Sequence, residues 1–261
     1  MVTGLSPVIQ EMKKISRYWE HLNSASNDFL NEFGYDHFKE SVGRLYNDDM
    51  GHEALMESIK ELWDYLYEVI PPELLDKFSE PLIGTPIYLL CEGRPVTVDL
   101  GLSLWDYWTI SKYVDFNEID KITEIGGGYG RLAYVILKLH PHIQYTMCDV
   151  EPALGVAQWY LPQVLYKPNI RYIHPEDLHS NTDLAIACNC LHEMTPEQVH
   201  YYFKFFDNNA RYVYYTCWKN TTIPIDGIQW EQHDYPIKDT WTKLIEQDYI
   251  KDSYFEALYK T

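Results

Sequence analysis

A glycine-rich run between Glu124 and Arg131, with the sequence EIGGGYGR, has residue types and spacing suited to holding a ligand. It lies where a predicted strand turns into a predicted helix. Glycines at such a turn let the backbone bend sharply and approach a ligand without obstruction from Cβ atoms. We therefore expect a small molecule to lie across the carboxyl ends of the strands.

The spacing within this run indicates which ligand it holds. The dinucleotide fingerprint G-x-G-x-x-G does not fit, because Arg131 and Tyr129 stand where its glycines are required. The pattern is instead acidic-x-G-x-G-x-G, which resembles the class I S-adenosylmethionine-dependent methyltransferases. The resemblance implies that the loop wraps the methionine and ribose portions of S-adenosylmethionine. The expected cofactor contacts in the loop are Glu124, Gly126, Gly127, Gly128, Tyr129, Gly130 and Arg131.

Carboxylates follow the next two predicted strands. Asp149 ends one strand, where a carboxylate can accept hydrogen bonds from both hydroxyls of a ribose. After the following strand, the methyltransferase resemblance implies a carboxylate facing the adenine amino group. Asp177 fits this role, with Glu176 as the alternative. Beside these strand ends, the remaining expected cofactor contacts are Val150, Leu178 and Asn189.

A histidine and a glutamate follow the fourth predicted strand, in the segment Leu-His192-Glu193-Met-Thr. This segment resembles the His-Asp pair of plant-type small-molecule O-methyltransferases, which implies that His192 is the general base. Glu193 is the reserve candidate or the partner that orients the imidazole. A predicted helix beginning near Thr195 would disfavour imidazolium and keep the ring able to accept a proton.

A longer stretch resembles a narrower family. The segments VTVDL from Val96, EIGGGYGRLAYVIL and CDVEPALGVAQWYL are similar to the sugar O-methyltransferases of polysaccharide and glycan gene clusters, over residues 94–162. The resemblance implies methyl transfer to a hydroxyl of a nucleotide-sugar or glycan terminus. Glu151 departs from the family's usual Asp-Ile/Leu-Pro-Pro-Ala-Leu turn. The alternatives are an O- or N-methyltransferase of non-sugar small molecules and a non-catalytic methyltransferase-like module.

Short apolar strands alternate with helices beyond residue 95. Such alternation predicts a doubly wound α/β Rossmann-like fold, with a seven-stranded, mostly parallel sheet. Helices are expected at 103–114, 132–139, 153–161 and 196–206, the last opened by a capping box at Thr195. Strands are expected at 121–125, 143–150, 169–173, 184–188 and 211–216.

The region before residue 95 has helical periodicity, clearest from Leu55 to Ile70 and ended by Pro71-Pro72. Turn-forming residues fill 81–95, as in a domain joint. We therefore predict a helical N-terminal segment over 1–95 and a cofactor-binding domain over 96–261. The first should build the acceptor site or an oligomer interface, with candidate polar contacts Arg44, Tyr46 and His52.

The composition of the 261-residue sequence argues against several classes of protein. A formal charge of −18 disfavours nucleic acid as a partner. The five cysteines show no CxxC spacing, so neither a disulfide framework nor a zinc knuckle is expected, and His140 and His142 are not expected to bind metal. With neither a signal-like start nor a long apolar run, the sequence predicts a cytoplasmic protein that does not insert into membranes.

Overall fold

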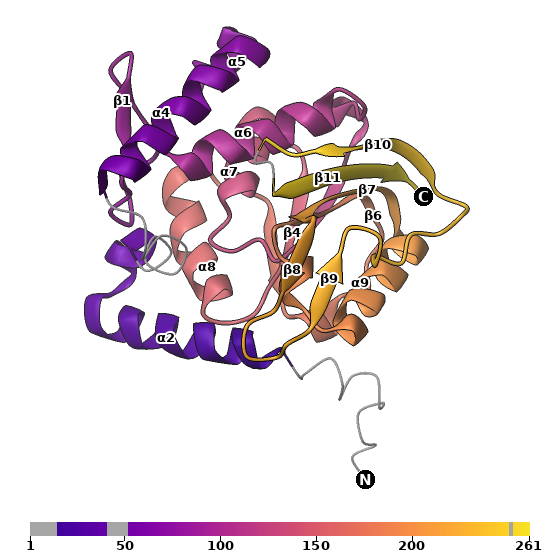
Figure 1. Ribbon diagram of the computed structural model, residues 1–261. Helices are drawn as coiled ribbons and strands as arrows, with labels where there is room; N and C mark the ends of the chain where they lie inside the picture. The colour runs from indigo at the N-terminus through magenta and orange to yellow at the C-terminus, as the bar shows by residue number, and fades with distance from the viewer. Residues whose placement is uncertain (1–14, 41–51, 251–252) are drawn as a thin grey trace.

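The computed structural model describes residues 15–40, 52–250 and 253–261, and a seven-stranded sheet lies at its centre (Figure 1). The strand order is β10-β11-β7-β6-β3-β4-β5. Neighbouring strands from β7 to β5 are parallel, whereas β11 is antiparallel to both β7 and β10. The predicted doubly wound, mostly parallel sheet is confirmed. Its strands are β3 (Lys121–Ile125), β4 (Gln144–Cys148), β5 (Ile170–Ile173), β6 (Thr182–Cys188), β7 (Ala210–Trp218), β10 (Thr242–Asp248) and β11 (Tyr254–Lys260).

Helices cover both faces of the sheet, and the strands are apolar on both sides as a result. Leu184 and Ile186 of β6 pack with α6 (Val98–Ser111), α7 (Arg131–Leu139) and α8 (Ala153–Val164). Ala185 and Ala187 of the same strand face the other way, toward α9 (Pro196–Asn209). Successive side chains of a strand point to opposite faces, so a doubly covered strand has a nearly continuous apolar sequence.

Two helices of the sheet domain begin at side-chain caps. The Thr195 hydroxyl accepts from Gln198 N and the Gln198 side chain accepts from Thr195 N, so the predicted capping box is confirmed. Helix α6 begins five residues earlier than the expected start at Ser103, because the Thr97 hydroxyl caps it by accepting from Leu100 N at 3.1 Å. The early start brings the first turn of α6 to the glycine loop.

The N-terminal helices are α2 (Arg17–Phe33), the 3₁₀ turn η1 (Tyr35–His37), α4 (His52–Val69) and α5 (Pro72–Leu75). Helix α4 buries Ile59, Trp63 and Leu66 against α6, as its periodicity predicted. The close approach depends on Gly101, where a Cβ would lie 2.8 Å from a methyl carbon of Leu62. The two helices share one core with the sheet, so the predicted boundary near residue 95 does not divide the hydrophobic core.

Short elements appear where the sequence indicated only turns. The passage 81–95 holds an antiparallel hairpin of β1 (Leu89–Cys91) and β2 (Arg94–Val96). A second hairpin, β8 (Asn220–Thr222) and β9 (Gln229–Glu231), follows β7. The 3₁₀ turns η2 (Phe116–Glu118), η3 (Pro175–Asp177) and η4 (Leu191–Glu193) precede or follow strands of the sheet. The turn η3 contains Asp177, the candidate for the adenine contact, and η4 contains His192 and Glu193, the candidates for proton transfer.

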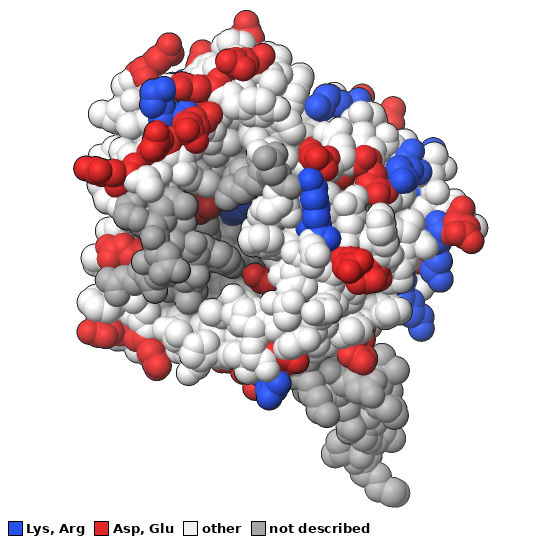
Figure 2. Space-filling view, in the orientation of Figure 1, with Lys and Arg blue, Asp and Glu red and all other residues white. Residues whose placement is uncertain are grey.

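The sequence carries a formal charge of −18, and one face of the molecule is hollowed. Figure 2 shows Asp and Glu side chains around a depression between α2 and α4. None of the helices in the described ranges combines the length and the hydropathy needed to cross a bilayer.

Candidate active site

The glycine loop between β3 and α7 uses its glycines for two different purposes. Gly126, Gly128 and Gly130 have φ values of 68°, 57° and 91°, in the left-handed region that favours glycine. A Cβ at Gly126 would lie 2.5 Å from Cys190 Cβ, and one at Gly130 would lie 2.5 Å from Leu161 Cδ1. A Cβ at Gly128 would meet no atom within 4 Å. Two glycines thus permit packing, while Gly128 borders open space.

Asp149 faces this open space from the end of β4. Gly128 N donates to its Oδ2 at 2.7 Å and Val150 N donates to its Oδ1 at 2.7 Å. Burial raises the pKa of Asp149 to about 6, and the two backbone donors limit the rise. The carboxylate is therefore ionised at neutral pH, fixed in direction, and still has lone pairs for a ligand's hydroxyls.

Glu124 lies beneath the loop, near the end of β3. Its Oε2 accepts from the Tyr145 hydroxyl at 2.8 Å, and a Cβ at Gly127 would come within 2.9 Å of the same oxygen. Burial raises the pKa of Glu124 to about 7, against the opposing effect of the Tyr145 hydrogen bond. A cationic ligand above the loop would shift this carboxyl toward its ionised form.

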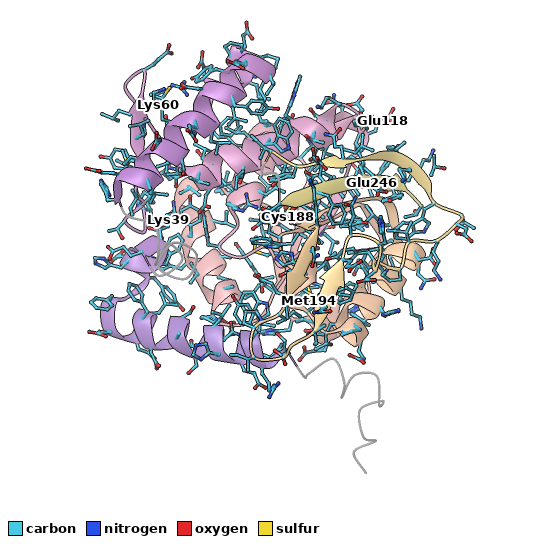
Figure 3. The ribbon with its side chains drawn as sticks, viewed as in Figure 1. Lys39, Lys60, Glu118, Cys188, Met194 and Glu246 are labelled. Atoms are coloured by element: carbon cyan, nitrogen blue, oxygen red, sulfur yellow. The ribbon has the colours of Figure 1, made fainter. Side chains whose placement is uncertain are left out.

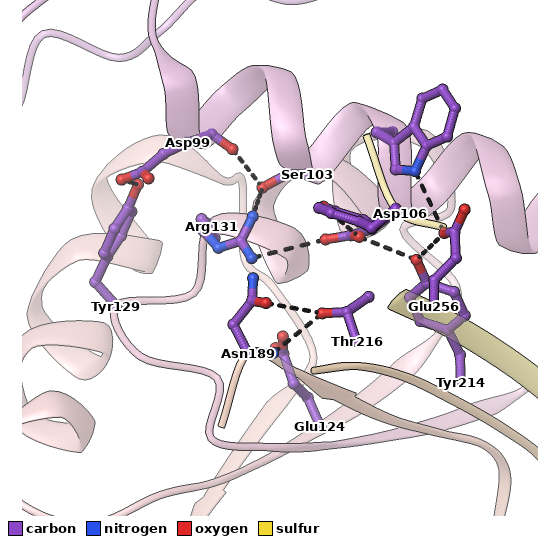
Figure 4. A network of polar contacts seen from close by, with 12 residues as sticks. Asp99, Ser103, Asp106, Glu124, Tyr129, Arg131, Asn189, Tyr214, Thr216 and Glu256 are labelled. Atoms are coloured by element: carbon purple, nitrogen blue, oxygen red, sulfur yellow. Dashed lines mark hydrogen bonds and ion pairs between the residues drawn. The ribbon is translucent and has the colours of Figure 1, made fainter. Parts of the chain in front are cut away.

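A buried polar network connects the loop to α6 (Figure 4). The Arg131 guanidinium donates to Ser103 Oγ at 3.0 Å and lies 3.7 Å from Asp106 Oδ2. The Tyr129 hydroxyl donates to Asp99 Oδ2 at 2.8 Å, from the first turn of α6. These contacts hold both ends of the loop's second half against one helix. Tyr129 and Arg131 therefore stabilise the loop as well as bordering the ligand space.

The same network continues into the antiparallel strands. Asp106 Oδ1 accepts from the hydroxyls of Tyr214 and Tyr249, at 3.1 and 2.9 Å. Tyr214 also approaches Glu256 Oε2 at 2.7 Å, and Trp105 Nε1 donates to that oxygen at 3.3 Å. Strand β11 is thus tied to the loop through α6.

His192 and Glu193 lie side by side in η4, directly after β6. His192 Nε2 is 3.9 Å from Glu193 Oε1, whereas His192 Nδ1 and Glu193 Oε2 have no hydrogen-bond partner in the part of the chain that the structure describes. Burial lowers the pKa of His192 to about 3 and raises the pKa of Glu193 to about 8. At pH 7 both are neutral. The neutral imidazole agrees with the sequence-based expectation, but burial rather than the helix N-terminus is its main cause.

Helix α2 covers this pair from a distant part of the sequence. Ser16 Oγ donates to the Glu193 carbonyl oxygen at 3.0 Å, and the Trp19 side chain near the Glu193 carboxyl limits the rise of its pKa. The start of α2 is held in place by Asp226, which accepts from Arg17 N at 3.2 Å and from Tyr18 N at 2.9 Å. The sequence had indicated no role for Ser16, Trp19 or Asp226.

Aromatic rings stand beside His192 at the ends of the antiparallel strands. Trp218 ends β7 and pairs in register with Tyr254, which begins β11. Their ring centroids are 4.6 Å apart, and they lie 6.1 and 6.3 Å from the His192 ring. On the other side, Met194 lies close to β8 and β9, where its carbonyl oxygen accepts from Trp230 Nε1 at 3.0 Å (Figure 3).

One cavity of about 1060 Å³ joins these groups. Its wall includes the glycine loop, the ends of β4 and β6, η4, the inner faces of α2 and α4, and the Trp218–Tyr254 pair. Residues predicted from sequence and found in the wall are Glu124, Gly126, Gly127, Gly128, Tyr129, Arg131, Asp149, Val150, Asn189, His192 and Glu193. The structure thus brings the cofactor candidates and the proton-transfer candidates into a single space.

Other candidates lie elsewhere. Gly130 sits behind the loop against Leu161, and Leu178 is buried in the core beneath α9. Asp177 is exposed in η3, whose Pro175 does line the cavity, so the adenine contact proposed for Asp177 stays a prediction. Arg44 and Tyr46 lie outside the described residues. Within the described ranges, no group of three or more His, Cys, Asp or Glu side chains could hold a metal ion.

Comparison with known proteins finds partial similarity to several methyltransferases. No protein-family model matches the chain. A curated protein, demethylspheroidene O-methyltransferase of Rhodobacter capsulatus, is 25% identical over 109 residues. That match covers 41% of this chain and only 23% of the length of the curated protein.

Solved structures share the architecture at low sequence identity. Mitomycin 7-O-methyltransferase matches 94% of this chain and 67% of its own, with a TM-score of 0.51 and 13% identity. Magnesium protoporphyrin IX methyltransferase of Synechocystis PCC 6803 matches 62% of this chain and 78% of its own, with a TM-score of 0.49 and 14% identity. The match to the mitomycin enzyme shows a common Rossmann-like fold over nearly the whole chain.

Proposed function

We propose that this protein is an S-adenosylmethionine-dependent methyltransferase that acts on a hydroxyl group. The observation that carries the proposal is the single cavity that has the glycine loop and Asp149 at one end and His192 with Glu193 at the other. Both the curated relative and the mitomycin enzyme are named as O-methyltransferases, which supports the same reaction class.

The residues at the loop fit the cofactor. Gly128 leaves space for a ligand to approach the backbone, and Asp149 presents a half-buried carboxylate to ribose hydroxyls. Glu124 supplies negative charge near the expected position of the cofactor's cationic groups. When bound, S-adenosylmethionine supplies an electrophilic methyl group, so the protein's tasks are orientation and proton removal.

His192 is proposed as the group that accepts the hydroxyl proton, with Glu193 as its electrostatic partner. A buried imidazole with a pKa of about 3 is a weak base by itself. Once Glu193 ionises, a carboxylate about 4 Å away favours imidazolium by about 4 kcal/mol at an effective dielectric constant near 20. That energy corresponds to about 3 pKa units. The pair is therefore expected to act best once Glu193 has lost its proton.

The acceptor is proposed to be a sugar hydroxyl, on a nucleotide-sugar or a glycan terminus. This part rests on the resemblance of residues 94–162 to the sugar O-methyltransferases. A non-sugar small molecule is the second candidate, favoured by the aromatic rings of Trp218, Tyr254 and Trp19 in the cavity wall. We also propose that the helical segment within 1–95 acts as a cap over the acceptor, because α2 and α4 line the same cavity.

The experiment that tests the reaction is release of S-adenosylhomocysteine from S-adenosylmethionine in the presence of hydroxyl acceptors, followed by mass spectrometry of the acceptor. A methylated oxygen on the acceptor is the expected product. Binding of NADH in place of S-adenosylhomocysteine would instead support an oxidoreductase, and methylation at nitrogen alone would overturn the hydroxyl assignment.

A further inference from the structure

The charges around the cavity limit which acceptors it can hold. Among the described residues of its wall, Lys39 and Arg131 are the only Lys or Arg side chains. Lys39 is buried and paired with Glu80, which also accepts from Thr97 Oγ1 at 2.8 Å. Arg131 is held by Ser103 and Asp106. Both cations are therefore already compensated by carboxylates.

The remaining charged side chains of the described wall are acidic. Asp99 and Glu124 each accept one hydrogen bond from a tyrosine, and among the described residues neither forms a salt bridge with a Lys or Arg side chain. Glu61 lies exposed on α4 at the cavity's edge. Beyond the two compensated pairs, the acidic residues are Glu61, Asp99, Glu124, Asp149 and Glu193. Glu193 is neutral at pH 7, but a diphosphate placed here would meet like charges on the ionised carboxylates among the other four, which cost free energy most strongly where water is excluded.

The wall nearest His192 has a different chemistry. Trp218 and Tyr254 are half-buried, and their rings border the cavity next to the imidazole. Trp19 of α2 also borders the cavity, near Glu193. Flat aromatic surfaces bind flat apolar surfaces, either another aromatic ring or the C–H face of a sugar. A ring lying on the Trp218–Tyr254 pair would present the groups on its edge to His192.

We propose, building on the methyltransferase function above, that the acceptor is a ring compound that lies with an apolar face on Trp218 and Tyr254, presents a hydroxyl at its edge to His192, and carries no phosphate. This deepens the proposed function by separating the acceptor classes that it left together. Free nucleotide-sugars and sugar phosphates are excluded, whereas an unphosphorylated glycoside and a phenol both have the required chemistry.

Saturation-transfer difference NMR on the complex with S-adenosylhomocysteine tests this inference without requiring turnover. The probes are methyl glycosides of common hexoses against the UDP-sugars of the same hexoses, and catechol against 2-hydroxyphenyl phosphate. We expect ring protons of at least one unphosphorylated probe to receive saturation, and its phosphorylated counterpart to receive at least fivefold less. The glycoside and catechol arms identify which kind of ring is the source.

Variants link the signal to the aromatic pair. Trp218→Ala should reduce the saturation transfer about tenfold and Trp218→Phe should restore most of it, with affinity for S-adenosylhomocysteine unchanged within twofold. Tyr166→Ala is the matched control, because Tyr166 is 90% exposed and outside the cavity wall.

Three results would overturn the inference while leaving the methyltransferase function standing: saturation of a phosphorylated probe equal to that of its partner, no saturation of any unphosphorylated ring, or insensitivity to Trp218→Ala. Failure of S-adenosylhomocysteine to bind at all would instead contradict the proposed function itself.

Discussion

The two ends of the cavity are built in different ways. The cofactor end comes from neighbouring parts of the sequence, because β3, the glycine loop and the end of β4 all lie within residues 121–150. The acceptor end combines α2, η4, β7 and β11, and the Ser16–Glu193 hydrogen bond there joins residues 177 positions apart. Changes at the first end should affect ligand affinity, and changes at the second should affect turnover or acceptor use.

The largest effect is expected from His192→Gln at the acceptor end. Turnover should fall by about a hundredfold or more, because the variant removes the proton acceptor without changing the cofactor end. Affinity for S-adenosylhomocysteine, measured by calorimetry, should stay within twofold. His233→Gln, at an exposed position, serves as the control. Retained turnover in His192→Gln, with loss in Glu193→Gln, would transfer the role of base to the carboxyl.

Within the cofactor end, Gly128 and Gly130 should respond differently to the same substitution. Gly128→Val places a side chain in open space that the cofactor would fill, so affinity for S-adenosylhomocysteine should fall at least tenfold. Both substitutions strain a backbone at positive φ, but Gly130→Val should lower the free energy of unfolding by about 1–3 kcal/mol more than Gly128→Val, because only its Cβ would overlap the Leu161 side chain. Titration calorimetry and urea unfolding measure the two effects. Equal loss of stability in both variants would contradict the distinction.

The difference between the two ends of the cavity also explains which parts of the site the sequence could predict. The loop and Asp149 follow from local signals: closely spaced glycines and a carboxylate ending a strand. The strand and helix alternation likewise predicted the sheet, since apolar residues on both faces of β3 to β7 demand cover on both sides. Each of these patterns can be recognised within one element or between two elements that are adjacent in the sequence.

Long-range contacts carried no equivalent signal. Trp218 and Tyr254 meet because β11 runs antiparallel beside β7, and the sequence analysis located neither β10 nor β11 by residue. The nearly continuous run of aromatic and apolar residues in Tyr254–Lys260 could have indicated a buried strand, but not its neighbour. Trp19 comes near Glu193 through long-range contacts of Ser16 and Asp226 at the start of α2. Asp177 is exposed in η3, so its contact with the adenine, implied by resemblance, stays a prediction.

Glu193→Gln tests the electrostatics of the acceptor end. The folded-state pKa of Glu193, about 8, lies above the ordinary value near 4.3, so the native state binds more protons between these values. Stability is therefore greatest below the lower value and is lost as pH rises through the upper one. Between pH 7 and 9 the wild type should lose about 1 kcal/mol that the variant keeps. Thermal unfolding across this range measures the difference.

The same variant should lose activity while it gains stability. Wild-type turnover should rise as pH passes 8, because the Glu193 carboxylate then supports imidazolium formation. Glu193→Gln should show a flat, low profile. Glu197→Gln, on the exposed first turn of α9, is the control. A wild-type profile that falls between pH 7 and 9 would contradict the role given to Glu193.

The smallest effect is expected at the contact between Asp226 and α2. Asp226→Ala removes acceptors for two backbone N–H groups and the exposed Arg17 ion pair, which together hold α2 over Glu193. Because exposed ion pairs contribute up to about 1 kcal/mol, the KM for the acceptor should rise about threefold. The KM for S-adenosylmethionine should not change. Asp64→Ala, which removes an exposed ion pair with Lys60 on α4, is the control.

The most direct test of the account is titration calorimetry of S-adenosylhomocysteine into the wild type and folded Asp149→Ala protein. We predict one binding site per chain in the wild type. Binding to Asp149→Ala should be at least tenfold weaker, because this variant lacks the carboxylate that accepts hydrogen bonds from the ribose hydroxyls. Absence of binding to the wild type, or equal affinity in the two proteins, would contradict the assignment of this cavity as a methyltransferase cofactor site.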